Sequence, residues 1–143
     1  MKEYIKNFDE WNIQRKMVQK NSVVESYDFF FHEKEVWWSA LGVNIGVEMD
    51  GKNENFERPV LVLRKINDQQ FYGIPVTSKD KKGEFYIKFI FGNNKNKNQG
   101  KVCLSQVRVF STKRLLRKIG KSNSDDFKNI KKVFVDFFSD GYE

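Results

Sequence analysis

Residues 57–78 read E-R-P-V-L-V-L-R-K-I-N-D-Q-Q-F-Y-G-I-P-V-T-S. The stretch contains two runs, 59–66 and 70–76, that are rich in the β-branched and aromatic residues typical of strands. The Asn-Asp pair between them is a common tight-turn sequence. We therefore predict two antiparallel strands joined by a hairpin. Arg58 stands just before the first strand and Thr77 just after the second, an arrangement that can converge on a phosphate.

Strand-like runs also occur on both sides of this hairpin. They cover residues 35–41, 84–91 and 102–110. The polar segment 92–101, rich in Asn and Lys, predicts a mobile loop. Several short strands joined mostly by short links favour a small antiparallel barrel. The predicted fold class is therefore mostly β with added helices (α+β).

Helical patterns flank the predicted barrel. Residues 2–20 place Tyr4, Ile5, Phe8 and Trp11 on one stripe, which predicts an amphipathic helix that packs through its Trp and Phe. Residues 111–120 predict a short helix ended by Gly120. A further helix is predicted to begin at Ser124, a good N-cap residue. Its apolar stripe, which should pack on the barrel, consists of Phe127, Ile130, Phe134 and Phe137 or Phe138.

The chain has 143 residues, which suits one domain with one modest core. We divide it into an N-terminal helical extension, 1–28, and a barrel domain, 29–143. The net charge is +7, but residues 79–121 alone carry thirteen basic and two acidic side chains. Such a basic stretch indicates a surface for a polyanion. The alternative is a solvated lysine-rich face without a partner.

The composition excludes several classes of site. His32 is the single histidine, so no pair of histidines can act as acid and base. Cys103 is the single cysteine and lies in an apolar run, which predicts a buried, inert thiol and a reducing cytoplasm. Metal-ligand motifs and phosphate-binding glycine loops are absent, so we expect no metal and no cofactor. The charged N-terminus predicts no signal peptide, and no apolar run is long enough for a membrane span.

RNA cleavage suits a site without histidine pairs or metals, because RNA carries its own nucleophile, the 2′-hydroxyl. An arginine fork can bind two phosphate oxygens and strengthens as charge builds there, which makes Arg58 a candidate. Thr77 can donate its hydroxyl to the phosphate or orient the 2′-hydroxyl. The structural alternatives are an ion pair of Arg58 with Glu57 or Glu48, and turn capping by Thr77.

Four sequence pieces occur together in this chain. They are G-V-N-I-G-V-E-M-D-G-K at 42–52, E-R-P-V-L-V-L at 57–63, G-I-P-V-T-S-K at 73–79 and L-S-Q-V-R-V-F-S-T-K-R-L-L at 104–116. In this order they resemble the MazF/PemK family of toxin endoribonucleases, over roughly residues 33–138. The resemblance implies an SH3-like barrel of the CcdB/MazF type. It also implies a two-fold homodimer, cleavage of single-stranded RNA to 2′,3′-cyclic phosphate and 5′-hydroxyl ends, and a cognate antitoxin protein that blocks the RNA groove.

The same resemblance implies roles for individual residues. Arg58 and Thr77 match the positions held to carry cleavage, and Ser78 lies beside them. Glu48 matches the acidic residue of a family loop, where it is either a base or a group that holds Arg58; Met49 stands where Gln is usual. Candidate RNA contacts are Trp37, Trp38, Phe56, Lys79, Lys95, Lys97, Gln106 and Arg108.

Two details refine these RNA contacts. Adjacent strand residues face opposite ways, so at least one of Trp37 and Trp38 is expected in the core. Gln106 and Arg108 are two residues apart and would share one face of a strand. Aromatic rings on such a face can stack on unpaired bases.

Two other functions remain open from the sequence. One is a toxin of the same fold that poisons DNA gyrase by protein contact through its C-terminal helix end. This chain ends in F-F-S-D-G-Y-E without a tryptophan, which disfavours that function. The other is an RNA-binding barrel without catalytic activity, which only an assay distinguishes from a nuclease.

Overall fold

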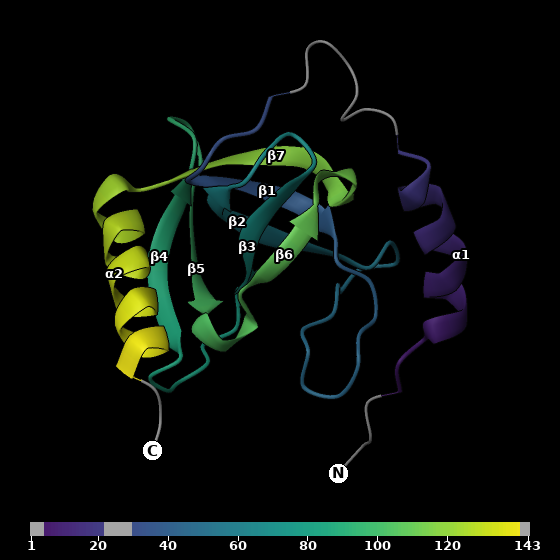
Figure 1. The fold of residues 1–143 in the computed structure, drawn as a ribbon, viewed down its shortest axis with the longest axis horizontal. Coiled ribbons are helices and arrows are strands. Elements are labelled where there is room, and N and C mark those ends of the chain that lie inside the picture. The colour runs from purple at the N-terminus through teal and green to yellow at the C-terminus, as the bar shows by residue number, and fades with distance from the viewer. Residues whose placement is uncertain (1–4, 22–29, 141–143) are drawn as a thin grey trace.

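The computed structural model describes residues 5–21 and 30–140. Within them, seven antiparallel strands form one sheet with the spatial order β2-β1-β7-β4-β5-β3-β6. The strands are β1 (Glu35–Ala40), β2 (Glu57–Lys65), β3 (Gln70–Thr77), β4 (Tyr86–Gly92), β5 (Lys97–Cys103), β6 (Arg108–Ser111) and β7 (Leu115–Ser122). Because β3 also pairs with β2, the sheet closes into a ring (Figure 1). The predicted antiparallel barrel of the α+β class is confirmed.

Two α-helices flank this barrel in the described part of the chain. They are α1 (Phe8–Gln19) and α2 (Ser124–Asp140). Figure 1 shows α2 along β4 on one side and α1 on the opposite side, next to the long loop that joins β1 to β2. Two single 3₁₀ turns, η2 (Leu104–Gln106) and η3 (Thr112–Arg114), interrupt the later strands. Neither α-helix is long and apolar enough to cross a membrane.

The predicted hairpin is present as β2 and β3. The Asn67 side-chain oxygen accepts the backbone N–H groups of Gln69 at 2.8 Å and Gln70 at 3.1 Å, which closes the turn. Val60 pairs with Pro75 further along. Gly73 is required here, because a Cβ would lie 2.7 Å from Val60 Cγ1 and 2.8 Å from a Phe110 ring carbon.

The barrel interior holds two apolar clusters. One cluster lies under α2 and contains Val36, Leu61, Ile74, Phe89, Val102 and Ile130, among others. The other contains Phe31, Trp37, Val60, Phe71 and Phe110, in which the Phe71 ring stacks on Phe110 and meets Phe31 at a tilt. Phe127 and Ile130 of α2 are buried, Phe134 and Phe137 pack against the first cluster, and Phe138 is 77% exposed. The predicted stripe of α2 is therefore confirmed, with Phe137 as its last member.

The helix predicted over 111–120 is wrong. Those residues form η3 and most of β7, which pairs with β1 and β4. Pairing with two strands satisfies the backbone and outweighs the local preference of a Leu- and Lys-rich segment for helix. Gly120 is a point of close approach and not a helix cap, because a Cβ there would lie 2.2 Å from the Gly92 carbonyl carbon.

Two strand boundaries also differ from the prediction. Most of the segment predicted as the loop 92–101 is strand, because β5 pairs with β4 as far as Lys97 opposite Gly92. Asn93 closes the short turn between them by accepting from the backbone N–H groups of Lys95 and Asn96. The single strand predicted over 102–110 is divided by η2 into β5 and β6.

The helix ends refine two further predictions. Asn123, and not Ser124, caps α2: its side-chain oxygen accepts from Asp125 N at 2.9 Å and Asp126 N at 3.3 Å. In α1 only Trp11 is buried. Phe8 is exposed, and so is Ile5, which lies before the helix begins. The predicted packing through Phe8 is therefore wrong, and Tyr4 lies outside the described residues.

Candidate functional site

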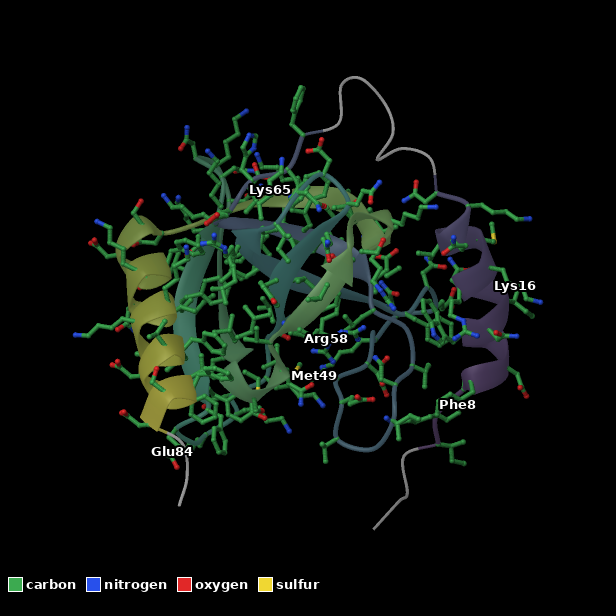
Figure 2. All side chains as sticks on the ribbon, in the orientation of Figure 1. Phe8, Lys16, Met49, Arg58, Lys65 and Glu84 are labelled. Atoms are coloured by element: carbon green, nitrogen blue, oxygen red, sulfur yellow. The ribbon has the colours of Figure 1, made fainter. Side chains whose placement is uncertain are left out.

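Arg58 is a buried arginine at the start of β2, with 8% of its surface exposed. Its Nε donates to the Asp50 carbonyl at 2.6 Å, and Nη1 donates to the Val76 carbonyl at 3.3 Å. These two carbonyls fix the plane of the guanidinium. The side chain lies where the β1–β2 loop approaches the barrel (Figure 2). Such an oriented cation can bind the oxygens of a phosphate.

Thr77 ends β3 close to this arginine. It directly follows Val76, whose carbonyl accepts from Arg58 Nη1 at 3.3 Å. The Thr77 hydroxyl oxygen accepts from the backbone N–H of Lys79 at 3.2 Å, which is the turn-capping contact considered above. A hydroxyl that accepts one bond retains its own proton to donate. Capping is therefore compatible with a contact to a phosphate oxygen.

The neighbouring carboxylates have other partners. Glu57 accepts from Arg117 Nη2 at 2.8 Å and from Asn53 Nδ2 at 3.3 Å. Glu48 accepts from the backbone N–H of Ile45 at 2.8 Å, inside its own loop. The atom that orients Arg58 Nε is the main-chain carbonyl of Asp50, a residue that the sequence did not single out. No sequence signal marks this role, because any residue carries a carbonyl.

A pocket of about 380 Å³ opens beside Arg58. Its apolar surface is made by Trp38, Pro59, Val76, Phe91 and Ile119, and its polar surface by Lys52, Asn53, Glu57, Ser78, Asn98 and Gln99. The Arg117 guanidinium lies 5.2 Å from the centroid of the Trp38 ring. An apolar surface with polar groups around a half-buried Trp suits a planar heterocycle such as a nucleobase.

The two adjacent tryptophans have different surroundings. Trp37 is 8% exposed, belongs to the second core cluster and donates Nε1–H to Glu35 Oε1 at 3.0 Å. A ring in that position cannot stack on a base, so Trp37 is removed from the candidate RNA contacts. Trp38 points the other way and lines the pocket. The alternation of strand side chains decides between them.

Three other candidate contacts lie elsewhere. Phe56 packs against Trp11 with ring centroids 5.7 Å apart, so it holds α1. Gln106 accepts from Met49 N at 3.0 Å and donates to Val47 O at 3.1 Å, so it holds the β1–β2 loop. Arg108 lies on β6 over the Phe110 ring. The predicted common strand face of Gln106 and Arg108 does not exist, because Gln106 lies in the turn η2 and Arg108 lies in strand β6.

Basic side chains gather around two further hollows that border β5. One, of about 350 Å³, is lined by Lys79, Lys88 and Lys101 and shares Ser78, Gln99 and Gly100 with the Arg58 pocket. The other, of about 730 Å³, is lined by Lys34, Lys97, Lys118 and Lys121. The exposed Lys95 lies in the β4–β5 turn.

Positive charge is also concentrated at the Arg58 pocket itself. Burial lowers the pKa of Lys52, and the positive charges of Arg58, Lys79 and Lys81 lower it further. Four cations that repel one another would all be stabilised by a bound anion. This region is therefore suited to a phosphate group.

A family model described as a PemK-like, MazF-like toxin of type II toxin-antitoxin systems matches residues 32–138. The chain belongs to this toxin family. A type II toxin has an antitoxin as partner, so the family implies one for this PemK-like toxin. A solved structure described as "Crystal structure of Mtb toxin" is similar over 55% of this chain and 90% of that chain, with 16% identity and a TM-score of 0.46. Among curated proteins there is no significant match.

Two features of this PemK-like toxin bear on its site. In the described part of the chain, no three His, Cys, Asp or Glu side chains come together as metal ligands would. Helix α1 lies entirely before residue 32, outside the part that matches the family.

Proposed function

We propose that this PemK-like toxin is an endoribonuclease that cleaves single-stranded RNA without a metal ion. The observation that carries the proposal is Arg58, whose guanidinium is fixed by two carbonyls, one of them from Val76 next to Thr77, and lies beside a base-sized pocket. The 2′-oxygen attacks phosphorus and loses its proton, while the bond from phosphorus to the 5′-oxygen breaks and that oxygen gains a proton. The products carry 2′,3′-cyclic phosphate and 5′-hydroxyl ends.

Arg58 stabilises the transition state in this proposal. Negative charge builds on the non-bridging phosphate oxygens as the new bond forms, and a guanidinium already held in place meets that charge without reorganising. Burial strengthens the interaction because little water competes for the oxygens. Lys52 adds a second positive charge at the pocket.

Thr77 and Ser78 contribute hydroxyl groups at the end of β3. The Thr77 hydroxyl donates to the phosphate or to the 2′-oxygen and so fixes the direction of attack. Ser78 is exposed, lines the pocket and supports the same phosphate. Glu48 remains a candidate base, although its carboxylate holds the backbone of its own loop in this structure.

The RNA path follows from the hollows along β5. One base enters the pocket at Trp38, and the neighbouring phosphates lie over Lys79 in one direction and Lys97 in the other. Phosphate contacts of this kind fix the position of the strand without reading its sequence. Discrimination between bases then falls to the polar groups of the pocket, such as Asn53 and Asn98.

The test is an RNA digest in excess EDTA, followed by chemical analysis of the product ends. Cleavage that persists and leaves cyclic phosphate and 5′-hydroxyl ends is the expected result. RNA that binds but stays intact would favour a non-catalytic barrel. Inhibition of DNA gyrase by a protein that leaves RNA intact would favour the topoisomerase poison.

A further inference from the structure

We propose that helix α1 is part of the catalytic apparatus, and that Lys6 is a positioning residue that fixes Arg58 by way of Asp50. The catalytic part of this inference rests on the proposed nuclease function. The mechanical part, the connection from Lys6 to Arg58, does not.

The first observation is the set of partners of Lys6. Its Nζ donates to the Asn44 carbonyl at 2.6 Å and to the Gly46 carbonyl at 3.0 Å, and it lies 3.4 Å from Asp50 Oδ2. An ammonium has three N–H donors, and these three acceptors match them. All three acceptors belong to the β1–β2 loop. Only 16% of the Lys6 side chain is exposed, so water competes weakly for these bonds.

The second observation is that Asp50 connects Lys6 to Arg58. One carboxylate oxygen of Asp50 lies beside Lys6, and the other accepts from Asn44 N at 2.6 Å. The main-chain carbonyl of the same residue accepts from Arg58 Nε at 2.6 Å. The side chain of Asp50 is therefore held by Lys6 while its backbone holds Arg58. A shift of this residue changes the direction of the guanidinium.

The third observation is the packing of Trp11 beneath the same loop. A Cβ at Gly42 would lie 2.1 Å from Trp11 Cε2, so the indole lies directly against the backbone there. On its other side Trp11 meets the Phe56 ring edge-on. The Phe56 carbonyl in turn accepts from Leu41 N and Gly42 N, each at 3.0 Å. Trp11 thus supports the two ends of the loop where they come together.

The helix is also anchored at its far end. Lys113 Nζ donates to the Gln19 carbonyl at 2.8 Å, and Asn21 Nδ2 donates to the Lys113 carbonyl at 2.8 Å. Because α1 is bound to the loop at one end and to η3 at the other, it can transmit the rigidity of the barrel to the Asp50 segment. Figure 1 shows α1 standing beside this loop along its length.

The experiment uses the full chain with Lys6→Met, which keeps an unbranched apolar stem but removes the ammonium. Lys6→Arg tests rescue by another cation. The matched control is Lys16→Met, at an exposed lysine of α1, the helix that follows Lys6 (Figure 2). Two quantities are measured: the ¹⁵N signal and hydrogen exchange of Arg58 Nε–H by NMR, and single-turnover cleavage of RNA together with its dissociation constant.

For Lys6→Met we expect faster exchange at Arg58 Nε–H and a single-turnover rate lower by about tenfold, because small misplacements of catalytic groups are costly. The RNA dissociation constant should change less than twofold, since Lys6 is not proposed to touch RNA. Lys6→Arg should restore most of the rate, and Lys16→Met should match the native chain.

The double variant Lys6→Met with Asp50→Asn checks the connection itself. If Lys6 acts through Asp50, the two changes together should lower the rate little more than one alone. Full additivity would overturn the connection, and so would unchanged Nε–H exchange in a folded Lys6→Met protein. A third outcome separates the two parts of the inference. If Arg58 Nε–H exchanges faster in Lys6→Met but the native protein does not cleave RNA, the mechanical link is supported and the proposed nuclease function is rejected.

Discussion

At the scale of single residues, the site depends on how Arg58 is held. Main-chain carbonyls orient the guanidinium, whereas the carboxylates of Glu57 and Glu48 bind Arg117 and the backbone of Ile45. A carbonyl carries no net charge, so these two bonds orient Arg58 without neutralising it.

Replacement of Arg58 tests this role directly. Arg58→Ala should lower cleavage by about 10²–10³-fold, because one transition-state contact is lost. Arg58→Lys should also be poor, since an ammonium cannot reproduce the planar fork. Single-turnover kinetics measure the effect. Two buried carbonyls lose a donor in Arg58→Ala, so unfolding should be checked alongside; a folded variant that cuts RNA at the native rate would remove Arg58 from the mechanism.

Thr77 offers a second test at this scale. Thr77→Val keeps the branched shape and removes the hydroxyl, so we expect slower cleavage with little loss of RNA affinity. Thr77→Ser should retain most of the rate. The measurement compares single-turnover rates with the affinity for an RNA that lacks the reactive 2′-hydroxyl. If Thr77→Val and the native protein cleave RNA at equal rates, Thr77 has no catalytic role and only caps the turn through its bond to Lys79 N.

At the scale of elements, β7 is the strand that sequence patterns missed. It runs between β1 and β4, and its pairing closes the barrel wall beside the Arg58 pocket. Glycine at position 120 permits this closure, since the backbones of β7 and β4 approach one another there. The sequence pattern indicates a helix end at the same glycine, because glycine is common both at helix ends and where two backbones approach closely.

Gly120→Ala should therefore destabilise the fold. The new Cβ would lie 2.2 Å from Gly92 backbone atoms, which cannot move aside as a flexible side chain can. A loss of about 1–3 kcal/mol in unfolding free energy is expected from such overpacking. Denaturant unfolding measures it, with the exposed neighbour Lys121→Ala as control. If both variants unfold like the native protein, β7 and β4 are not packed as described.

At the scale of the whole molecule, lysines line two hollows that border β5, and one of these hollows shares Ser78, Gln99 and Gly100 with the Arg58 pocket. The proposed RNA path follows these hollows, and the alternative is lysines that serve only solubility. The other global question is assembly. A deep groove is more easily built between two copies of a small barrel, and two-fold pairing is the commonest form of closed assembly.

RNA affinity should fall steeply with salt, by a slope of about −0.7 in log K against log salt for each phosphate contact. Lys97→Glu should weaken binding more than Lys95→Glu, because Lys97 lines a hollow and Lys95 lies in a turn. The site of cleavage should not change. Lys132→Glu, on the exposed face of α2, is the control. A flat salt dependence would leave the basic stretch as a solvating surface.

We further expect a homodimer whose RNA groove is blocked by the antitoxin. An acidic peptide with a few large apolar anchors would complement the basic hollows and the Trp38 pocket, and would fold as it binds. Light scattering should give twice the chain mass at micromolar concentration; a monomer mass would reject the dimer. Competition binding should show that antitoxin displaces uncleavable RNA, and simultaneous binding would reject groove blocking.

The sequence by itself determined the elements whose signals are local. The β2–β3 hairpin follows from two β-rich runs around Asn-Asp, and α2 follows from its Phe and Ile spacing. Arg58 and Thr77 were proposed as site residues from the same pattern, because they stand at the strand ends of that hairpin. Alternation along β1 required that its two tryptophans point in opposite directions.

Only the tertiary structure decided features that depend on distant partners. Residues 115–122 form a strand because they pair with β1 and β4. Trp38 lines the pocket because the core lies on the side of the sheet to which Trp37 points. The tertiary structure also packed Phe56 against Trp11 of α1, and it placed the Asp50 carbonyl where it orients Arg58. The physical reason is the same throughout: pairing, burial and main-chain hydrogen bonds depend on which segments meet, and residue type does not encode that.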